Sequence, residues 1–474
     1  MKRRDFLKSG SIAALGSMLI SPFGLKANTI KEEFGGKKAK NIIFMVSDGM
    51  SVGTLHMADI YSRRKLGRAS HWLSLYENNL VQRAMMDMAS ASSIVTDSAA
   101  ASSSWGGGVR VNNGSLNISP DGKENMPILQ KFKKAGKKVG KKVGCVTTVP
   151  INHATPAGFC VTSKKRSAMD DIAMDYLDLG FDVMMGGGTK YFEADKRKDA
   201  VDLDAKFRSK GYTVVKNKAE MLSAPKNKPI LGTFDEEALP YTVDHNSCDK
   251  MKANIPTLAE MTEKAISQMK DHPKGFVMQV EGGKVDWAAH GNDVAALLYD
   301  QLAFDEAVKV AIDFAKKDGN TLVVITSDHG NANPGLIYGK TCNDNFDHIQ
   351  NFKNSNEWIL QGIQPDSTVS FVKERIAKAC GDMVLSDDQA KQLLSYYSKA
   401  KQEDGLYNPR HLPFKLLSEM QKDYTSVGWI SMDHSSDYTE LAMFGPGSER
   451  LKPLMRNTDI HTFLLDAAEV ENKF

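Results

Sequence analysis

The sequence contains few cysteines, and those present follow no recognisable pattern. Only five occur among 474 residues, and no two of them have the C-x-x-C spacing of a zinc-binding motif. Because the number is odd, at least one thiol is unpaired within a monomer. We therefore predict neither a cysteine-ligated metal site of that kind nor any particular disulfide.

An excess of positive charge is also missing once the N-terminus is set aside. The formal net charge is +3, but residues 1–27 contain five basic residues and one acidic residue, so the rest of the chain carries a charge of about −1. A strongly basic surface is the usual electrostatic requirement for nucleic-acid binding. Nucleic acid is therefore not a predicted ligand.

No apolar run near the N-terminus is long enough to cross a membrane. The run at residues 12–20 is shorter than the roughly 20 residues that a transmembrane helix requires. It follows a charged head with the pair Arg3-Arg4, the arrangement of a twin-arginine signal peptide. We predict a signal peptide at residues 1–27, export to the periplasm or secretion, and no transmembrane segment. A disordered basic tail is the alternative.

Three segments share one design, a continuous apolar run that ends in acidic residues and glycine. They are residues 41–49, 275–283 and 321–330. Such runs are typical of strands buried on both faces of a sheet, and a helical pattern at 294–317 separates two of them. The predicted fold class is α/β, with a central, mostly parallel sheet flanked by helices. Ligands bind such sheets beyond the carboxyl ends of the strands, which is where each run places its carboxylate.

The rest of the sequence predicts one catalytic domain, residues 28–474, with an insertion. Residues 331–427 are polar and irregular, and we interpret them as an insertion or cap over the sheet edge, with helices near 387–401 and 413–420. Residues 440–444 are expected to form another strand. A closing helix is expected at 459–468.

Carboxylates and histidines gather at the predicted strand ends. Asp286 and His290 are spaced i, i+4 on a helix start, so both can hold one cation, and His434 is a candidate third ligand. Asp328-His329 and Asp48 follow the ends of two other strands. Taken alone, each group is more often a surface pair or a set of turn residues. Chance alone would seldom give three strands that all end in this way.

Ser98 begins an Ala-rich helix start after Thr96-Asp97. A serine at a helix N-terminus lies near unpaired N–H groups and the positive end of the dipole, which favours its ionisation and a bound phosphate. In isolation such a serine is usually a cap. No GxSxG elbow is present, so activation by a metal is the alternative to a Ser-His-Asp triad.

The chain resembles alkaline phosphatases over nearly all of the sequence after residue 27. The matching motifs occur in the order found in that family and lie at 46–50, 96–100, 153–157 and 280–290, at Asp328-His329 and at His434. The resemblance implies two zinc ions and one magnesium ion. It assigns the first zinc to Asp286, His290 and His434, and the second to Asp48, Asp328 and His329, with Ser98 beside it as nucleophile. The third site would take Asp48, Thr155 and Glu281, with His153 nearby.

The resemblance also implies a phosphate-binding arginine thirteen residues after His153, which is Arg166, oriented by Asp97. Arginine suits this role because it donates two parallel hydrogen bonds to phosphate oxygens. His153 stands where some members of the family have an aspartate. Since a neutral imidazole removes one negative charge, we expect weaker magnesium retention and activation by added magnesium.

The implied reaction is hydrolysis of phosphate monoesters, with broad specificity, through a phosphoserine at Ser98. The resemblance also implies a homodimer. A sulfatase or phosphodiesterase on the same sheet is the nearest rival. Ser98 lacks the Cys/Ser-x-Pro-x-Arg context of sulfatases, and diesterases of this fold generally lack the third-site residues seen here as Thr155 and Glu281. A non-catalytic phosphate- or metal-binding protein is the alternative from another class.

Overall fold

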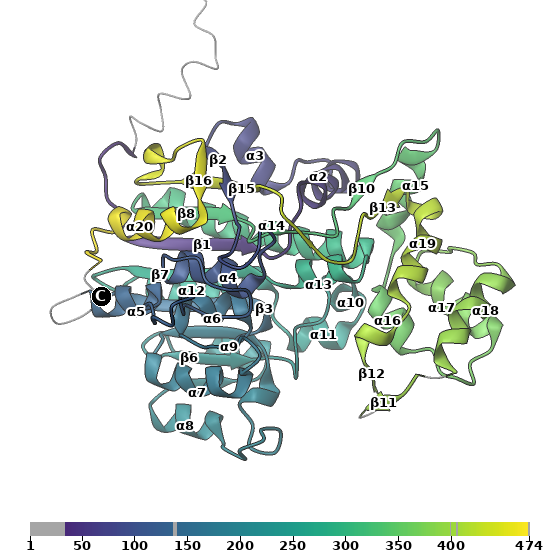
Figure 1. The fold of residues 1–474 in the computed structure, drawn as a ribbon, viewed down its shortest axis with the longest axis horizontal. Helices are drawn as coiled ribbons and strands as arrows, with labels where there is room; N and C mark the ends of the chain where they lie inside the picture. Colours follow the sequence, from purple (N-terminus) through teal and green to yellow (C-terminus); the bar gives the residue numbers. More distant parts are fainter. Residues whose placement is uncertain (1–33, 136–139, 399, 404–405, 473–474) are drawn as a thin grey trace, which may run out of the picture.

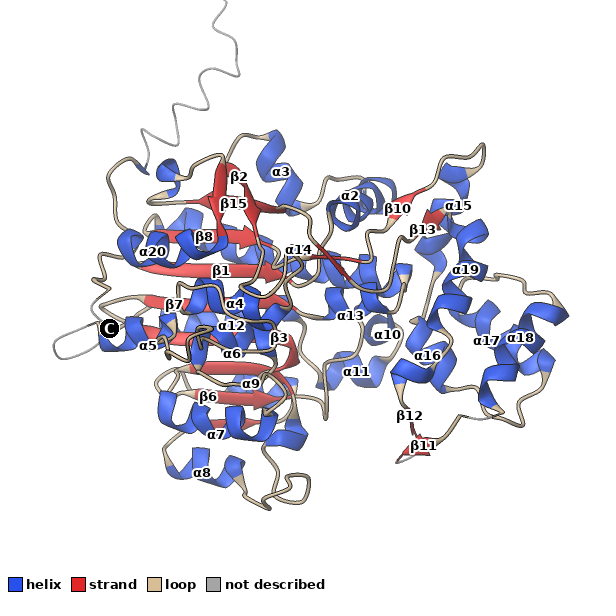
Figure 2. Cartoon of the chain, viewed as in Figure 1, coloured by secondary structure: helices blue, strands red, loops and turns tan. Residues whose placement is uncertain are grey.

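The computed structural model describes residues 34–135, 140–398, 400–403 and 406–472. The predicted signal peptide, residues 1–27, lies outside them. A ten-stranded sheet forms the centre of the molecule, in the order β16-β2-β15-β8-β1-β7-β3-β4-β6-β5 (Figures 1 and 2). Its strands are β1 Asn41–Ser47, β2 Gln82–Asp87, β3 Lys142–Pro150, β4 Val183–Gly187, β5 Thr213–Val215, β6 Ile230–Thr233, β7 Phe276–Gly282, β8 Thr321–Thr326, β15 Thr439–Phe444 and β16 Leu454–Arg456.

The sheet is mostly parallel, which confirms the predicted fold class. Strand β15 is antiparallel to both of its neighbours, β8 and β2. The three acid-terminated runs form β1, β7 and β8, and β1 lies between the other two. In register, Val46 of β1 pairs with Glu281 on one side and with Thr326 on the other. The carboxyl ends of all three strands therefore meet at one place on the sheet edge.

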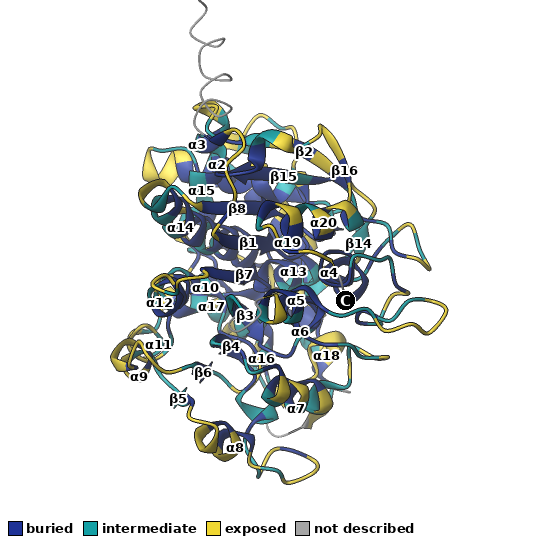
Figure 3. Ribbon diagram, turned by 90° about the vertical axis from the view of Figure 1, so that its left-hand side faces the viewer, coloured by how far each residue is buried: buried dark blue, intermediate teal, exposed yellow. Residues whose placement is uncertain are grey.

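Helices cover both faces of the sheet because the central strands are apolar on both sides. Along β1, Ile43 and Met45 belong to one buried cluster, while Ile42 and Phe44 belong to the other. The first cluster takes in α2 Val52–Leu66, α3 His71–Glu77, α12 Leu258–Met269 and α14 Val294–Asp318. The second takes in α4 Ser98–Gly106, α5 Ile128–Lys134, α6 Ala154–Cys160, α7 Met169–Leu179, α8 Leu203–Ser209 and α20 Asn457–Ala467. Figure 3 shows the buried layer between them.

Further helices follow the carboxyl side of the sheet. Near it lie α10 Thr242–Asn246, α11 Asp249–Asn254 and α13 Lys284–His290, whereas α9 Lys218–Ser223 packs into the first cluster through Met221 (Figure 1). A lobe at the right of Figure 1 contains α15 Cys342–His348, α16 Asn356–Gln361, α17 Val369–Ala379, α18 Asp387–Tyr397 and α19 Phe414–Thr425. None of the helices in the described ranges is long and apolar enough to span a membrane.

The lobe occupies most of residues 331–427 and is more regular than the sequence predicted. Two helices were expected there, and the described part of this segment contains five α-helices. The expected helix at 413–420 continues to Thr425, where Ser426 ends it in a left-handed conformation. Helix α18 stops at Tyr397, four residues before the expected end. The division of the chain into a catalytic domain and an insertion stays a prediction.

Three small ribbons complete the described fold. They pair β9 Gly330–Asn331 with β14 His434–Ser435, β10 Gly335–Leu336 with β13 Val427–Gly428, and β11 Gln402–Glu403 with β12 Leu406–Tyr407. The β9–β14 pair brings His434 beside the end of β8, where Asp328 and His329 lie. All five cysteines are free thiols.

Candidate active site

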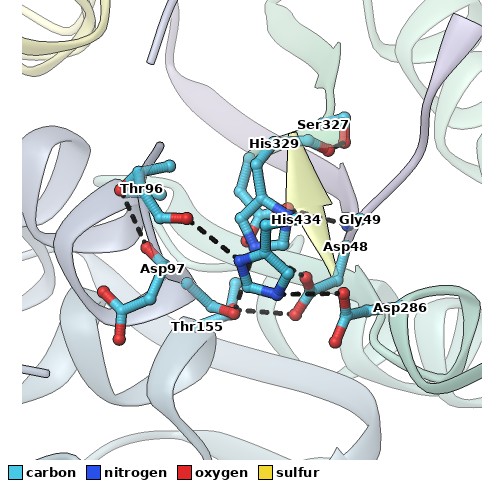
Figure 4. Close-up of polar contacts among 12 residues, drawn as sticks. Asp48, Gly49, Thr96, Asp97, Thr155, Asp286, Ser327, His329 and His434 are labelled. Atoms are coloured by element: carbon cyan, nitrogen blue, oxygen red, sulfur yellow. Dashed lines mark hydrogen bonds and ion pairs between the residues drawn. The ribbon is translucent and has the colours of Figure 1, made fainter. Parts of the chain in front are cut away.

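Buried carboxylates mark the meeting point of β8, β1 and β7. Asp48 follows β1 directly, Asp328 follows β8 after one intervening residue, and Glu281 is the second-last residue of β7; all three are buried. Thr155, in the first turn of α6, donates to Asp48 Oδ2 at 3.2 Å (Figure 4). Thr147 of β3 donates a short hydrogen bond to Glu281. Four strands and one helix thus converge on this cluster.

The turn at Gly49 lets a fourth carboxylate approach. Gly49 has φ +66°, and a Cβ atom there would lie 2.5 Å from Asp286 Oδ1. Its backbone N–H donates to Asp328 Oδ1 at 2.9 Å. Only glycine combines this left-handed backbone with so close an approach. Asp286, in the first turn of α13, therefore lies against the Asp48 turn.

Three histidines near these carboxylates each contact a backbone carbonyl through the same ring nitrogen, Nδ1. The Nδ1 atoms of His290, His329 and His434 lie 2.6, 3.3 and 3.0 Å from the backbone oxygens of Met432, Gly330 and Thr96. Because a carbonyl can only accept, each Nδ1 carries the proton in the neutral ring and each Nε2 carries the lone pair. This is the arrangement in which backbone carbonyls orient histidine ligands of a metal.

The lone pairs of two histidines point at one another. His290 Nε2 and His434 Nε2 are 3.1 Å apart, and Asp286 oxygens lie 3.4 and 3.5 Å from them. Two acceptors facing each other beside a carboxylate are unfavourable unless a cation lies between them. His329 stacks on His434 with ring centroids 3.7 Å apart, so the second histidine pair adjoins the first.

The electrostatics of the cluster call for bound cations. Burial, reinforced by neighbouring carboxylates, raises the pKa of Asp328 to about 8 and that of Asp48 well above its usual range. Burial also raises the pKa of Glu281 to about 7. Among the described residues, no donor hydrogen-bonds to Asp48 Oδ1, Glu281 Oε1 or Asp328 Oδ2. Buried, unpaired carboxylate oxygens of this kind are characteristic of metal sites.

The ligand atoms fall into three groups, each compact enough to surround one ion. They are Asp286, His329 and His434; Asp48, Asp328 and His329; and Asp48, His153 and Glu281. The first two groups combine carboxylate oxygen with imidazole nitrogen, a donor set that suits zinc. The third group, with Thr155 beside it, is richer in oxygen and suits magnesium.

Ser98 lies within this arrangement at the first position of α4. Its side chain is buried, and Ser98 Oγ is 3.3 Å from His329 Nε2. Asp97 caps the helix, accepting from the N–H of Ala100 at 2.9 Å, so the Asp97 side chain and the Ser98 hydroxyl diverge. The serine faces the ligand groups, and the aspartate faces the neighbouring loop.

Arg166 is held beside Ser98 by two partners. It donates from Nη1 to Asp97 Oδ2 at 3.0 Å and from Nη2 to His153 Nε2 at 3.1 Å. Burial, together with the Arg166 charge, lowers the pKa of His153 to about 3, so this imidazole is neutral. Its Nε2 lone pair is therefore engaged by Arg166 in this structure. About a quarter of the Arg166 side chain, 26%, remains exposed.

All twelve site residues predicted from the sequence thus lie in one connected network. The structure adds residues that the sequence analysis did not single out. Asn331 donates from Nδ2 to Asp286 Oδ1 at 2.7 Å, and Thr147 contacts Glu281. Asn331 stands three residues after Asp328, directly after the run 321–330, so proximity was the only available signal. Thr147 lies inside an apolar strand and carries no signal.

A parallel α/β sheet whose carboxyl edge bears a buried serine, an arginine and three groups of metal-ligand side chains defines a hydrolase of phosphate esters. Comparison with known proteins agrees. The sequence model of the alkaline phosphatase family matches residues 39–470. Alkaline phosphatase 4 of Bacillus subtilis is 32% identical over 432 residues, which cover 89% of this chain and 87% of that protein.

Alkaline phosphatase of Escherichia coli is 29% identical over 386 residues, or 70% of this chain and 81% of that protein. The crystal structure of Thermus thermophilus alkaline phosphatase superposes with a TM-score of 0.84 at 29% identity, covering 97% of this chain and 96% of that one. This chain belongs to the alkaline phosphatase family. It is accordingly a phosphoric monoester hydrolase.

Proposed function

We propose that the enzyme hydrolyses phosphate monoesters through a phosphoserine at Ser98, assisted by two zinc ions and one magnesium ion. The observation that carries the proposal is the position of Ser98. Its hydroxyl lies at a helix N-terminus, 3.3 Å from His329 Nε2 and among three ligand groups, with Arg166 held alongside.

The residues present fit the metals. Asp286, His290 and His434 would hold the first zinc, and Asp48, Asp328 and His329 the second. The compact group around Asp286 contains His329, and His290 adjoins it with its Nε2 atom 3.1 Å from that of His434. Asp48, Thr155 and Glu281 would hold magnesium, with His153 at its edge. Bound zinc would supply Lewis-acid chemistry, lowering the pKa of a nearby hydroxyl group and offsetting the negative charge that develops on oxygen.

Ser98 would carry the phosphoryl group between two displacements. Its oxygen attacks phosphorus, the bond between phosphorus and the alcohol oxygen breaks, and the alcohol leaves with a proton. Water then attacks the phosphoserine, which releases inorganic phosphate and restores the Ser98 hydroxyl. The unpaired N–H groups at the start of α4 favour negative charge at this position in both steps.

Arg166 would bind two phosphate oxygens and orient the group for attack. Its partners Asp97 and His153 hold the guanidinium plane from opposite nitrogens, and this limits the rotamer freedom that binding would otherwise cost. Since these contacts address only the phosphate, the alcohol part of the substrate is weakly selected and specificity is broad. Export and homodimer formation are further proposals, which rest on the N-terminal pattern and on family resemblance.

His153 bears on the third site. A neutral imidazole that is hydrogen-bonded to Arg166 contributes less to cation binding than a carboxylate would. We expect added magnesium to raise the activity of enzyme prepared without it. Full activity after selective magnesium depletion would contradict this expectation.

The function is tested by p-nitrophenyl phosphate hydrolysis and metal analysis of the same preparations. Ser98→Ala should lose activity by several orders of magnitude while keeping its zinc ligands. Ser104→Ala is the matched control, because Ser104 lies in the same helix and its hydroxyl donates only to the Ala101 carbonyl. Wild-type activity in Ser98→Ala would refute the assignment of Ser98 as nucleophile.

A further inference from the structure

The turn that follows Asp328 and His329 has an unusual backbone. Ala332 and Asn333 are consecutive non-glycine residues with positive φ, +55° and +42°, and Ala332 is completely buried. Left-handed backbone is disfavoured for residues with a Cβ atom, although asparagine tolerates it best. Such strain persists only where the surrounding structure determines it and is concentrated at functional sites.

This turn holds the segment that carries His434. The Ala332 N–H donates to the Asp433 carbonyl at 2.9 Å, and the Ala332 carbonyl accepts from the N–H of Ile430 at 3.0 Å. Asn331 pairs with His434 across the β9–β14 ribbon. These backbone hydrogen bonds therefore fix the position of His434 relative to the end of β8.

The Asn333 side chain connects the turn to two further segments. Its Oδ1 accepts from the Ser51 hydroxyl at 2.7 Å and from the Ser435 hydroxyl at 2.9 Å. Ser51 follows Asp48 by three residues and precedes α2, and Ser435 is next to His434. One oxygen atom thus joins the segments that follow β1, β8 and His434. Each hydroxyl has a second acceptor: the Asn331 carbonyl lies 3.0 Å from Ser51 Oγ, and Asp437 Oδ2 lies 2.9 Å from Ser435 Oγ.

The close packing around this oxygen shows that the junction is built to a tight tolerance. A Cβ atom on Gly330 would lie 2.5 Å from Ser435 Oγ and 3.2 Å from Ser51 Oγ. A Cβ atom on Gly53 would lie 1.9 Å from the Pro334 carbonyl. On its other sides Asn333 lines two surface hollows of about 290 and 280 Å³, so the hydroxyl contacts, rather than apolar packing, determine where its side chain lies.

We propose that Asn333 is a positioning residue for the first metal site, acting through His434. Its side chain fixes the His434 segment against the Asp48 and Asp328 segments, so that the ligands of the two proposed zinc ions keep their spacing. The inference rests on the proposed role of His434 as a zinc ligand. Loss of a residue that orients a ligand typically weakens metal binding about 10- to 100-fold.

Two substitutions separate the side-chain contact from the backbone strain. Asn333→Gly keeps the left-handed backbone but removes the acceptor, and Asn333→Asp keeps an acceptor in a residue that tolerates the same backbone. The readout is the rate at which the zinc-loaded enzyme loses zinc to a chromogenic chelator, together with zinc content per chain. We expect zinc loss about 10-fold faster or more in Asn333→Gly and close to wild type in Asn333→Asp.

His434→Ala and Ser418→Ala are the reference and the control. Ser418 lines the same surface hollow as Asn333, but its hydroxyl donates to the Lys415 carbonyl within α19, so its loss should leave zinc release unchanged. If Asn333 acts through His434, the double variant with Asn333→Gly should lose zinc no faster than His434→Ala alone.

The outcomes distinguish the inference from the function on which it rests. Zinc release at the wild-type rate in Asn333→Gly, or a full additive effect on top of His434→Ala, would overturn the positioning role alone. Zinc release unchanged in His434→Ala would overturn the ligand assignment and the inference with it. A purely structural role would lower the thermal midpoint of the metal-free protein without changing zinc release, and this result also counts against the inference.

Discussion

At the scale of single residues, the hydrogen-bond partners of Arg166 distinguish it from its basic neighbours. Lys164 and Lys165 precede it in the chain, yet the contacts to Asp97 and His153 are made by Arg166. A planar guanidinium can keep both partners and still present N–H groups to a ligand, whereas an ammonium group cannot.

Arg166→Lys should therefore raise KM for a phosphate monoester and weaken inhibition by inorganic phosphate. The loss of one charge-assisted hydrogen bond, about 1.5–3 kcal/mol, corresponds to a fall in kcat/KM of roughly 10- to 150-fold. Steady-state kinetics with p-nitrophenyl phosphate provide the measurement. Unchanged KM and phosphate inhibition would show that Arg166 does not contact the substrate.

The sequence was sufficient to predict that Asp48 and Asp328 lie at strand ends, because an apolar run that ends in Asp is typical of a strand in a parallel sheet. Asn331 and Asn333 could not be predicted in this way. Their importance lies in contacts to Asp286, Ser51 and Ser435, which are distant in the chain, and amide and hydroxyl side chains are common in any loop. Contacts of this kind become visible only once the strands are placed.

At the scale of secondary-structure elements, the turn between β1 and α2 determines how closely Asp286 can approach the segment that carries Asp48. Gly49→Ala should place a methyl group against Asp286 and disturb both proposed zinc ions. Gly67→Ala is the matched control, since Gly67 has nearly the same φ, +67°, with nothing within 4 Å of its Cβ position.

Both alanine variants bear the cost of a left-handed backbone, about 1 kcal/mol. Only Gly49→Ala should also lose zinc and activity, which thermal unfolding, metal analysis and kinetics would reveal together. Equal activity in the two variants would mean that the approach of Asp286 to the turn is not required.

Helix α14 offers a pH-dependent test that is independent of the metals. Asp300 accepts from the Thr242 N–H and hydroxyl of α10, and burial raises its pKa to about 7, against the influence of Lys284. Because the folded-state pKa exceeds the usual value, the folded protein binds this proton more tightly than the unfolded chain does. The resulting stabilisation is present at about pH 4 and is lost as the pH rises through 7.

Asp300→Asn removes this titration. The stability of the wild type relative to Asp300→Asn should fall between about pH 4 and pH 7, with a slope of at most about 1.4 kcal/mol per pH unit. Thermal midpoints of the two proteins across this range provide the comparison. A difference that does not change with pH would show that Asp300 titrates normally.

The sequence predicted α14 and, within the polar segment 331–427, α18 and α19, but it did not predict α15, α16 or α17. The pattern at 294–317 predicted α14 to within one residue. In contrast, α17 buries only Val372, Ile376 and Ala379, and this narrow stripe is hard to distinguish from loop sequence. Its N-cap, Thr368, is visible only as one polar residue among many.

At the scale of the whole molecule, metals should contribute to stability as well as to chemistry. Asp48, Asp328 and Glu281 are buried beside one another, so the metal-free protein must bear their mutual repulsion or take up protons. Removing the metals should lower the thermal midpoint, because a ligand at a free concentration 1,000 times its Kd stabilises the folded state by about 4 kcal/mol.

Thermal unfolding before and after chelation, followed by addition of zinc and magnesium, tests this expectation. The midpoint should fall on chelation and recover when the metals are restored. A thermal midpoint that does not change with either treatment would contradict the proposed metal sites.

The sequence predicted the overall α/β class through its alternating strands and helices, whereas the position of the lobe depends on contacts between distant segments.

The central claim is that Ser98 carries the phosphoryl group, and rapid-quench trapping tests it most directly. The metal-loaded enzyme would be mixed with excess phosphate monoester, quenched in acid within milliseconds and digested for mass spectrometry. The proposed function predicts a phosphorylated peptide at Ser98 in the wild type and in Ser104→Ala, and none in Ser98→Ala. Turnover without phosphate at Ser98, or with phosphate on another residue, would contradict it.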